Sequence, residues 1–509
     1  MSDEPRRPEA VVALLPLDER PACAELPARI AAVAGVRLAL PPSELLPRLR
    51  TPGDPRGLSA WLAERAADCD AAVVSLEMLG HGGLIASRTG TASAHDVLRD
   101  WDGLAAWAGT DRPVHGVTLV TRTPDSADAM EEPDYWNPYG PALHRHSAAL
   151  HRAEEQAAGP AAPTGIPEAV RADFLGRRLR NHTLNLAGLD LVARGRLDTL
   201  VVGADDTAPW GLATAELAQL RLWRDRLGLG SRVAVRPGAD EAVTALVART
   251  LRDLFGGPPV TVAVEAVDPA GLRTVAPYEN MPVADTAAGQ IAACGAVLTD
   301  DPDAGLHLLV HTPDGSGDWA VAPPGQRLES AATTARALAA RARELLDGGH
   351  EVAVADCAQP NGADPLLVEA LHRAGVAGRL TAYAGWNTAG NTLGTAVAHG
   401  VTVVLARRAG TFDERAHRLL LAHRFIEDWG YMTRVRAAAR TTLGSVLGAH
   451  DHVPPDHTVL TEIAQGLARC AAELPELGHA LVPESVRLPW HRTFEADFAL
   501  TPTHPEESR

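Results

Sequence analysis

The sequence predicts an α/β fold with two parallel-sheet, Rossmann-like lobes and a helical C-terminal region. Apolar runs of strand length alternate with helix-like periodic segments, which is the pattern of parallel sheets covered on both faces. The chain has 509 residues, too many for one simple core, so two or three domains are expected. An N-terminal (β/α)8-type barrel is the alternative, because roughly six to eight early strands are able to close into one.

The first half of the chain contains a series of apolar runs that are predicted strands. These runs cover residues 11–17, 36–40, 71–76, 114–120, 199–203 and 232–236. The segments SAWLAERAA and TAELAQLRLWRDRL, which lie between them, are predicted helices. The breaker FGGPPV at 255–260 separates two domains. We therefore expect an N-terminal α/β domain over residues 1–256.

A second series of predicted strands follows the breaker. It covers residues 260–267, 306–311, 351–357, 379–385 and 401–406. We expect a second α/β domain over residues 257–410 and a mainly helical C-terminal region over residues 411–509. Near its end, PWHRTFEAD (489–497) is predicted either to fold back as a lid or to dock as a strand.

The composition excludes several classes of protein. A net charge of -17 argues against a nucleic-acid or anionic-membrane partner, and no segment offers the uninterrupted apolar stretch of a membrane span. The chain has no lysine, which excludes Schiff-base catalysis and an ordinary P-loop. Its 5 cysteines form no CxxC pair, which is typical of a reducing compartment, so we expect a cytoplasmic protein. The sequence leaves the oligomeric state open.

Polar and charged side chains follow nearly every predicted strand. In open parallel sheets, ligands bind at the carboxyl ends of the strands, so these side chains are expected to form one cleft. From the first half, the candidates are Asp18, Arg20, Glu77, Arg88, Arg122, Asp205, Asp206, Asp240 and Glu241. From the second half, the candidates are Asp356, Asn361, Trp386, Asn387 and Asn391.

This set of side chains suits a small carbohydrate ligand. Carboxylates accept hydrogen bonds from hydroxyl groups, and arginine and asparagine donate to sugar oxygens. Trp210 and Trp386 are candidates to stack on the apolar face of a sugar ring. No GxGxxG follows a predicted strand, so a dinucleotide is not indicated.

The adjacent carboxylates Asp205 and Asp206 need an explanation of their own. Neighbouring carboxylates repel and usually require a cation, a proton or a partner rich in donors. Successive residues leaving a strand point in opposite directions. We therefore predict that one of the two faces the cleft and the other caps or braces the helix that begins near Trp210.

A metal ion is an alternative use of the carboxylates. Oxygen ligands with one imidazole suit Mg²⁺ or Mn²⁺ better than zinc. The candidate ligands are Asp18, Glu77, His81, Asp205 and Asp206. Carboxylate clusters without paired histidines suit acid and base work equally well, so we predict no cofactor and leave Mg²⁺ or Mn²⁺ open.

A series of short blocks, taken in order, resembles the signature blocks of one bacterial family. They are PLDERP, SLEMLGHGGLIASR, GADDTAPWG, RPGADE, ADCAQPNGADP, YAGWNTAGNTLGTA and PWHRTFE, and they run from residue 16 to about residue 497. The family is catalogued as domain of unknown function four-one-two-seven, and its label implies no activity. Proteins of this family look similar to sugar-catabolism neighbours, and this similarity implies that the ligand is a carbohydrate. The family is expected to carry an aromatic residue where this chain has His81, which argues against a ligand role for His81.

The leading hypothesis is a glycoside hydrolase, or a related carbohydrate-active enzyme, acting on a small sugar conjugate such as an amino-sugar conjugate. Glycosidic cleavage generally uses two carboxyl groups that flank the bond. We expect Asp205 or Asp206 to face Asp18 or Glu77 across the cleft. Two alternatives stay open: a metal-dependent hydrolase or isomerase of a sugar or sugar acid, and a sugar-binding protein without chemistry.

Overall fold

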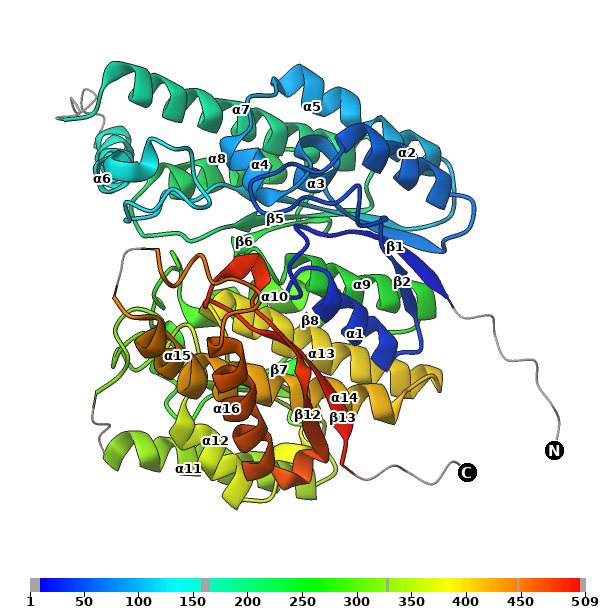
Figure 1. Cartoon of the computed structure of the whole chain (residues 1–509). Helices are drawn as coiled ribbons and strands as arrows, with labels where there is room; N and C mark the ends of the chain where they lie inside the picture. Colours follow the sequence, from blue (N-terminus) through cyan, green and yellow to red (C-terminus); the bar gives the residue numbers. More distant parts are fainter. Residues whose placement is uncertain (1–9, 157–164, 326–328, 446–447, 504–509) are drawn as a thin grey trace.

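The computed structural model describes residues 10–156, 165–325, 329–445 and 448–503 (Figure 1). The predicted first and last regions therefore include residues, 1–9 and 504–509, that lie outside the described part. Two parallel sheets with helices on both sides form the protein, as the sequence predicts.

The first sheet has six parallel strands in the order β2-β1-β3-β4-β5-β6. They are β1 (Val11–Leu15), β2 (Arg37–Ala39), β3 (Ala71–Ser75), β4 (Val114–Val120), β5 (Thr199–Ala204) and β6 (Val233–Pro237). Each lies within about two residues of its predicted range. Among the described residues, the edge strands β2 and β6 do not pair with each other, so the sheet is open and the barrel alternative is not observed.

The second sheet has five parallel strands in the order β11-β10-β9-β7-β8. They are β7 (Thr261–Glu265), β8 (Val297–Leu298), β9 (Leu306–His311), β10 (Val352–Asp356) and β11 (Ala382–Ala384). Counted from β8, this order is the 2-1-3-4-5 order with which the first sheet also begins, one of the common doubly wound orders. The sequence did not predict β8, a two-residue strand with both side chains exposed.

Alternate side chains of the first sheet enter two different cores. In β1, Val12 and Leu14 point toward the second sheet, and Ala13 and Leu15 point to the outer helices. Figure 1 shows these outer helices above the sheet. They are α2 (Pro55–Arg65), α3 (Leu76–His81), α5 (Ala94–Asp100), the 3₁₀ helix η1 (Trp101–Trp107), α6 (Trp136–Glu155), α7 (Glu168–Ala193) and α8 (Leu212–Arg226). Helices α2 and α8 contain the helical segments that the sequence predicts.

A layer of helices separates the two sheets. Figure 1 shows α1 (Glu25–Val33), α9 (Ala242–Phe255), α10 (Val283–Ala293) and α13 (Ala389–Ala409) in this layer. Their apolar side chains join those of both sheets in one continuous core. The two sheets are therefore parts of one packed body.

The predicted strand at residues 401–406 is wrong, because these residues lie inside α13. This helix is buried on all sides, so it lacks the polar face by which a helical period is recognised. The sequence analysis also found no segment apolar enough for a membrane span, whereas α13 meets that criterion by length and composition. Its apolar stretch is entirely buried inside the protein, as in the core helices of other folds.

The second sheet and the C-terminal region complete the fold. Helices α11 (Glu329–Asp347) and α12 (Pro365–Arg373) pack on each other beside the second sheet. The C-terminal region contains α14 (Glu414–Phe425), a π-helical segment η4 (Ile426–Val435), α15 (Arg436–Leu443) and α16 (Val459–Glu473). It ends in an antiparallel pair, β12 (His479–Arg487) and β13 (Asp497–Pro502), which the sequence did not predict.

The contact between α9 and α13 depends on a buried carboxylate. Glu241, just before α9, accepts hydrogen bonds from Nδ2 of Asn391 at 2.6 Å and from Nε2 of Gln290 at 2.7 Å. It also forms an ion pair with Arg236. A carboxylate is buried at low cost only when it is paired and hydrogen-bonded, so these contacts restrict how the two helices meet.

We expect Gly394→Ala to lower the free energy of unfolding by about 1–3 kcal/mol, because it overpacks this contact. The added carbon would lie 2.3 Å from Cγ of Glu241 and 2.6 Å from Oε1 of Gln290. Gly176→Ala in α7 is the matched control, because no heavy atom lies within 4 Å of the added carbon. The control is expected to gain up to about 1 kcal/mol from helix propensity. Urea unfolding measures both, and equal stabilities would contradict the close packing.

Candidate functional site

A cavity of about 310 Å³ lies at the carboxyl ends of the strands of both sheets. The segments after β1, β3, β4, β5 and β6 line it from the first sheet, and those after β7, β9, β10 and β11 from the second. Helix α15 and the segment between β12 and β13 also contribute to its wall. This is the edge at which open parallel sheets bind ligands.

Eight residues of the predicted site line this cavity. They are Arg20, Arg88, Arg122, Asp205, Asp206, Asp240, Asn361 and Asn387. Arg88 lies on α4 (Leu84–Thr89), and the others lie in the segments that follow the strands. Strand ends that are distant in sequence therefore meet in one polar site.

Three residues of the predicted site, Glu241, Trp386 and Asn391, do not line the cavity. Glu241 and Asn391 bond to each other between α9 and α13. Trp386 is buried, and its Nε1 donates to Oγ1 of Thr395 at 3.1 Å. Helix α13 begins at residue 389, so Asn387 lies before the helix and lines the cavity, whereas Asn391 lies inside the helix and does not.

Three further predicted residues lie outside the cavity wall. Asp18 is almost fully buried and bonds to Arg20. Asp356 accepts a hydrogen bond from the backbone N–H of Asp364 at 2.7 Å and thereby shapes the loop after β10. Trp210 is 41% exposed and packs against the ring of His151, with 5.1 Å between ring centroids.

Glu77, predicted as catalytic, lies at a second, small internal cavity. Its Oε1 accepts hydrogen bonds from the N–H of Leu119 at 2.7 Å and from Oγ1 of Thr118 at 2.9 Å. Burial raises the pKa of Glu77 to about 7, and these hydrogen bonds oppose the shift. Glu77 therefore braces β4 and does not face Asp205 or Asp206 across the main cavity.

Arg122 binds three carboxylates at the end of β4. Its guanidinium donates to Glu132 Oε1 at 2.8 Å, to Glu131 Oε2 at 3.1 Å and to Asp206 Oδ2 at 3.1 Å. Arg88 lies 2.9 Å from the same oxygen of Glu131 and forms an ion pair with Asp205. The two arginines together hold the carboxylates of two separate loops in one network.

Two carboxyl groups bound to Arg122 have pKa values shifted in opposite directions. Burial, followed by repulsion from Asp205, raises the pKa of Asp206 to about 6, although Arg122 opposes the shift. Burial also acts to raise the pKa of Glu131, but Arg122 and other arginines outweigh it and hold the pKa well below its ordinary value. The cavity thus places a carboxyl group with a raised pKa, Asp206, beside one with a lowered pKa, Glu131.

The predicted division of labour between Asp205 and Asp206 is wrong, because both line the cavity. Residue Gly211 stands at the N-cap of α8, without a capping side chain, and the N–H of Leu212 donates to Oγ of Ser147 at 2.8 Å. Asp206 has a φ of 38°, which is left-handed. This conformation interrupts the alternation of an extended strand, so adjacent side chains reach the same space.

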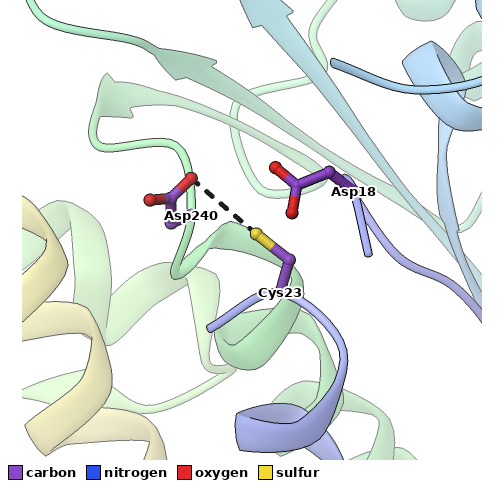
Figure 2. Close-up of side chains that lie close together, drawn as sticks. All are labelled: Asp18, Cys23 and Asp240. Atoms are coloured by element: carbon purple, nitrogen blue, oxygen red, sulfur yellow. Dashed lines mark hydrogen bonds between the residues drawn. The ribbon is translucent and has the colours of Figure 1, made fainter. Parts of the chain in front are cut away.

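A buried cluster beside the cavity has the composition of a metal site. Figure 2 shows the thiol of Cys23 between the carboxylates of Asp18 and Asp240, and their ligand atoms lie within 4.8 Å of one another. However, NH2 of Arg20 lies 2.7 Å from a carboxylate oxygen of each aspartate. Burial and both aspartates raise the pKa of the Cys23 thiol well above its ordinary value, so the sulfur is a poor metal ligand. The positive charge of the Arg20 guanidinium already offsets the negative charge of Asp18 and Asp240.

The residues of the predicted Mg²⁺ or Mn²⁺ site are divided among three places. The main cavity is lined by Asp205 and Asp206. Asp18 lies beside Cys23 and Asp240 and forms an ion pair with Arg20. The small internal cavity is lined by Glu77 and His81. Among the described residues, these five do not form one ligand set.

Left-handed backbone is concentrated around the cavity. Asp206, Tyr278 (φ 66°), Asn361 (φ 63°) and Asn387 (φ 49°) all line it, and tyrosine tolerates this conformation least. Such residues persist where surrounding contacts enforce them, often at ligand sites. Here the N–H of Asn361 donates to the carbonyl of Asn387 at 2.7 Å, and the N–H of Thr207 donates to that of Tyr278 at 2.9 Å. The second contact ties the loop after β5 to the loop after β7.

The sequence analysis missed several residues of the site. They are Glu131, Glu132, Tyr278, Arg440, Arg492 and Phe494. Glu131 and Glu132 are adjacent carboxylates, as are Asp205 and Asp206, and this signal was present in the sequence. No strand-end rule identifies Arg440, because it lies on α15.

A docking strand over residues 489–497 is not observed, because only Asp497 of this segment belongs to a strand, β13, which pairs with β12. Before it, Arg492 and Phe494 line the cavity, and Nε1 of Trp490 donates to Oε1 of Glu19 at 2.7 Å. The segment therefore folds back over the loop after β1.

The chain was compared with known families, curated proteins and solved structures. A family model described as "Protein of unknown function (DUF4127)" matches residues 12–499, which is nearly the whole chain. Neither a curated protein nor a solved structure matches the chain. The matched range includes every residue that lines the cavity.

We expect the contribution of Glu77 to stability to depend on pH. Because its folded pKa is raised from 4.5 to about 7, this contribution is present below pH 4.5 and is lost as the pH rises through 7. Glu77→Gln replaces the protonated group by a neutral one that does not titrate. The difference in free energy of unfolding between wild type and variant should fall by up to about 3 kcal/mol across this range. Denaturant unfolding at several pH values measures it, and a difference independent of pH would contradict the raised pKa.

Proposed function

Because the chain belongs to the DUF4127 family, a family of proteins of unknown function, we propose its activity from the cavity itself: hydrolysis of a glycosidic bond in a small sugar conjugate. The cavity volume of about 310 Å³ is at the lower end of the range for small-molecule sites. Its wall combines charged groups, amides and an aromatic ring, which suits a polyhydroxylated ligand.

The observation that carries this proposal is the placement of two adjacent carboxyl groups, Asp205 and Asp206, on the wall of one cavity. Burial raises the pKa of Asp206 to about 6, which favours a role as proton donor, and its side chain keeps 32% of its surface exposed. Beside it, Asp205 forms an ion pair with Arg88, and the proposal assigns it the role of the second carboxyl group. Glycosidases use two carboxyl groups of this kind, one protonated and one ionised.

In the proposed reaction, Asp206 protonates the glycosidic oxygen as the leaving group departs. Asp205 then acts either as the nucleophile at the anomeric carbon or as the base that activates water. Its contact with Arg88 involves Oδ2, and Oδ1 has no hydrogen-bond partner among the described residues. The anomeric configuration of the product, measured by NMR, distinguishes the two roles, since only the nucleophile gives retention.

Tyr278 and Asn387 are the proposed contacts to the sugar. Tyr278 is 40% exposed at the cavity and offers an aromatic face to a sugar ring. The side-chain amide of Asn387 has no hydrogen-bond partner within the described part of the chain, so its donors and acceptor are available to hydroxyl groups.

Two alternative functions have less support. A metal-dependent hydrolase needs a ligand set, and the predicted ligands are divided among three places. Elemental analysis and treatment with a chelator test that alternative directly. A sugar-binding protein that closes around its ligand needs lobes able to move, whereas here one hydrophobic core joins both sheets.

We expect Asp206→Asn to lower kcat by at least about a hundredfold, because general acid catalysis commonly contributes that much. The loss should be smaller for aryl glycosides with acidic phenols than for disaccharides, because a good leaving group needs less protonation. Asp225→Asn, at an exposed position of α8, is the control and should retain full activity. Both variants should unfold at the wild-type temperature. Inactivity of folded wild-type protein on a panel of aryl glycosides and amino-sugar disaccharides would count against the function.

The same assignment predicts the pH dependence of the reaction. The acid must carry its proton, so kcat should decline as the pH rises through about 6, the pKa of Asp206. An initial-rate profile at saturating substrate measures this limb. A rate that is constant from about pH 5 to about pH 8 would exclude Asp206 as the acid.

A further inference from the structure

Arg440 differs from the other arginines of the cavity wall. Arg20, Arg88, Arg122 and Arg492 each form an ion pair with a carboxylate of the chain. Arg440 forms none with any described residue. Its Nε donates to Oγ1 of Thr493 at 2.9 Å, and its NH1 donates to the carbonyl of Ala320 at 2.6 Å.

The second terminal nitrogen of Arg440 has no acceptor among the described residues, and it is not sealed from solvent. The two bonds to Thr493 and Ala320 fix the plane of the guanidinium at the cavity wall. A fixed guanidinium with a free edge is the usual partner of a carboxylate or a phosphate.

Arg436 adds a second positive charge behind this group. It lies one helical turn before Arg440 on α15 and is 1% exposed. Its NH1 donates to the carbonyl of Phe494 at 2.8 Å, its NH2 to that of Asn361, and its Nε is buried without a partner. No described carboxylate forms an ion pair with it.

Two like charges one turn apart, partly or fully buried, are unfavourable without an anion. The pKa values of both groups reflect this, since burial lowers each, and Arg440 further lowers the pKa of Arg436 to about 10. The carboxylates that act on Arg440 from a distance are Asp451 and Asp318. Neither lies within ion-pairing distance of Arg440, so no carboxylate in the described part of the chain pairs with this charge.

We propose that Arg440, supported by Arg436, binds an oxyanion carried by the ligand, either the carboxylate of a sugar acid or the phosphate of a sugar phosphate. The inference deepens the proposed function, on which it rests for the sugar part of the ligand. The anion itself is recognised through the fixed guanidinium and the positive charge behind it, and this recognition does not require that a bond is cleaved.

Calorimetric binding of D-glucuronate, D-glucose 6-phosphate and D-glucose to the full-length protein tests the subsite. At least one anionic sugar should bind more tightly than glucose, and added NaCl should weaken that binding, because ions screen the attraction. Arg440→Gln should lower the affinity for the anionic sugar by about tenfold to a hundredfold, the usual loss of a charge-assisted hydrogen bond, and leave glucose unaffected. Arg440→Lys should restore part of the affinity.

Arg434→Gln is the matched control, since Arg434 lies near the start of α15 and forms a half-exposed ion pair with Glu473. It should bind all three sugars as wild type does. Equal affinities for charged and neutral sugars, binding of none of the three, or an unchanged affinity in Arg440→Gln would each overturn the subsite. If Arg440→Gln does not fold, the comparison of sugars and salt on wild type decides.

The outcome separates this inference from the proposed function. Binding of an anionic sugar through Arg440 without hydrolysis of any glycoside supports the subsite and contradicts the hydrolase. Hydrolysis of glycosides by a protein that binds charged and neutral sugars equally, or whose affinity for anionic sugars Arg440→Gln does not change, contradicts the subsite and supports the hydrolase.

Discussion

The buried carboxylate of Glu241 determines how the two sheets meet. It lies just before α9, under the first sheet, and receives hydrogen bonds from Asn391 at the start of α13 and from Gln290 on α10. The absence of a side chain at Gly394 allows α13 to come this close. Because an unpaired buried carboxylate is costly, the contact favours one placement of the helices. That placement brings the carboxyl ends of both sheets to the same cavity.

The balance of charge within the cavity follows from this convergence. Loops from separate strands bring arginines and carboxylates together, and most of them neutralise one another in pairs. Asp206 is an exception, because it shares a single oxygen contact with Arg122 while Asp205 repels it. Arg440 is the opposite exception, since it lies on helix α15 and has no carboxylate partner among the described residues. A carboxyl group with a raised pKa and an arginine without a described carboxylate partner therefore line the same cavity.

The candidate site was predictable to the extent that it follows the strand ends. Arg20, Asp205 and Asn361 each lie in the segment that follows a strand, so the rule for open sheets places them at one edge. The same rule misplaced Glu77 and Glu241, which also follow strands. Their side chains point into the protein, where Thr118 and Leu119 bind one and Asn391 binds the other. Direction depends on partners from other elements, which a local pattern does not contain.

The sequence by itself determined the two series of strands, their parallel arrangement and the family, because apolar runs, breakers and ordered blocks are local features of the chain. It did not determine the state of residues 401–406, since a helix buried between two sheets and a buried strand are equally apolar. Nor did it determine that Asp205 and Asp206 share one cavity, which depends on the left-handed backbone at Asp206. Only the tertiary structure decided these points, because burial and hydrogen-bond partners are supplied by segments distant in sequence.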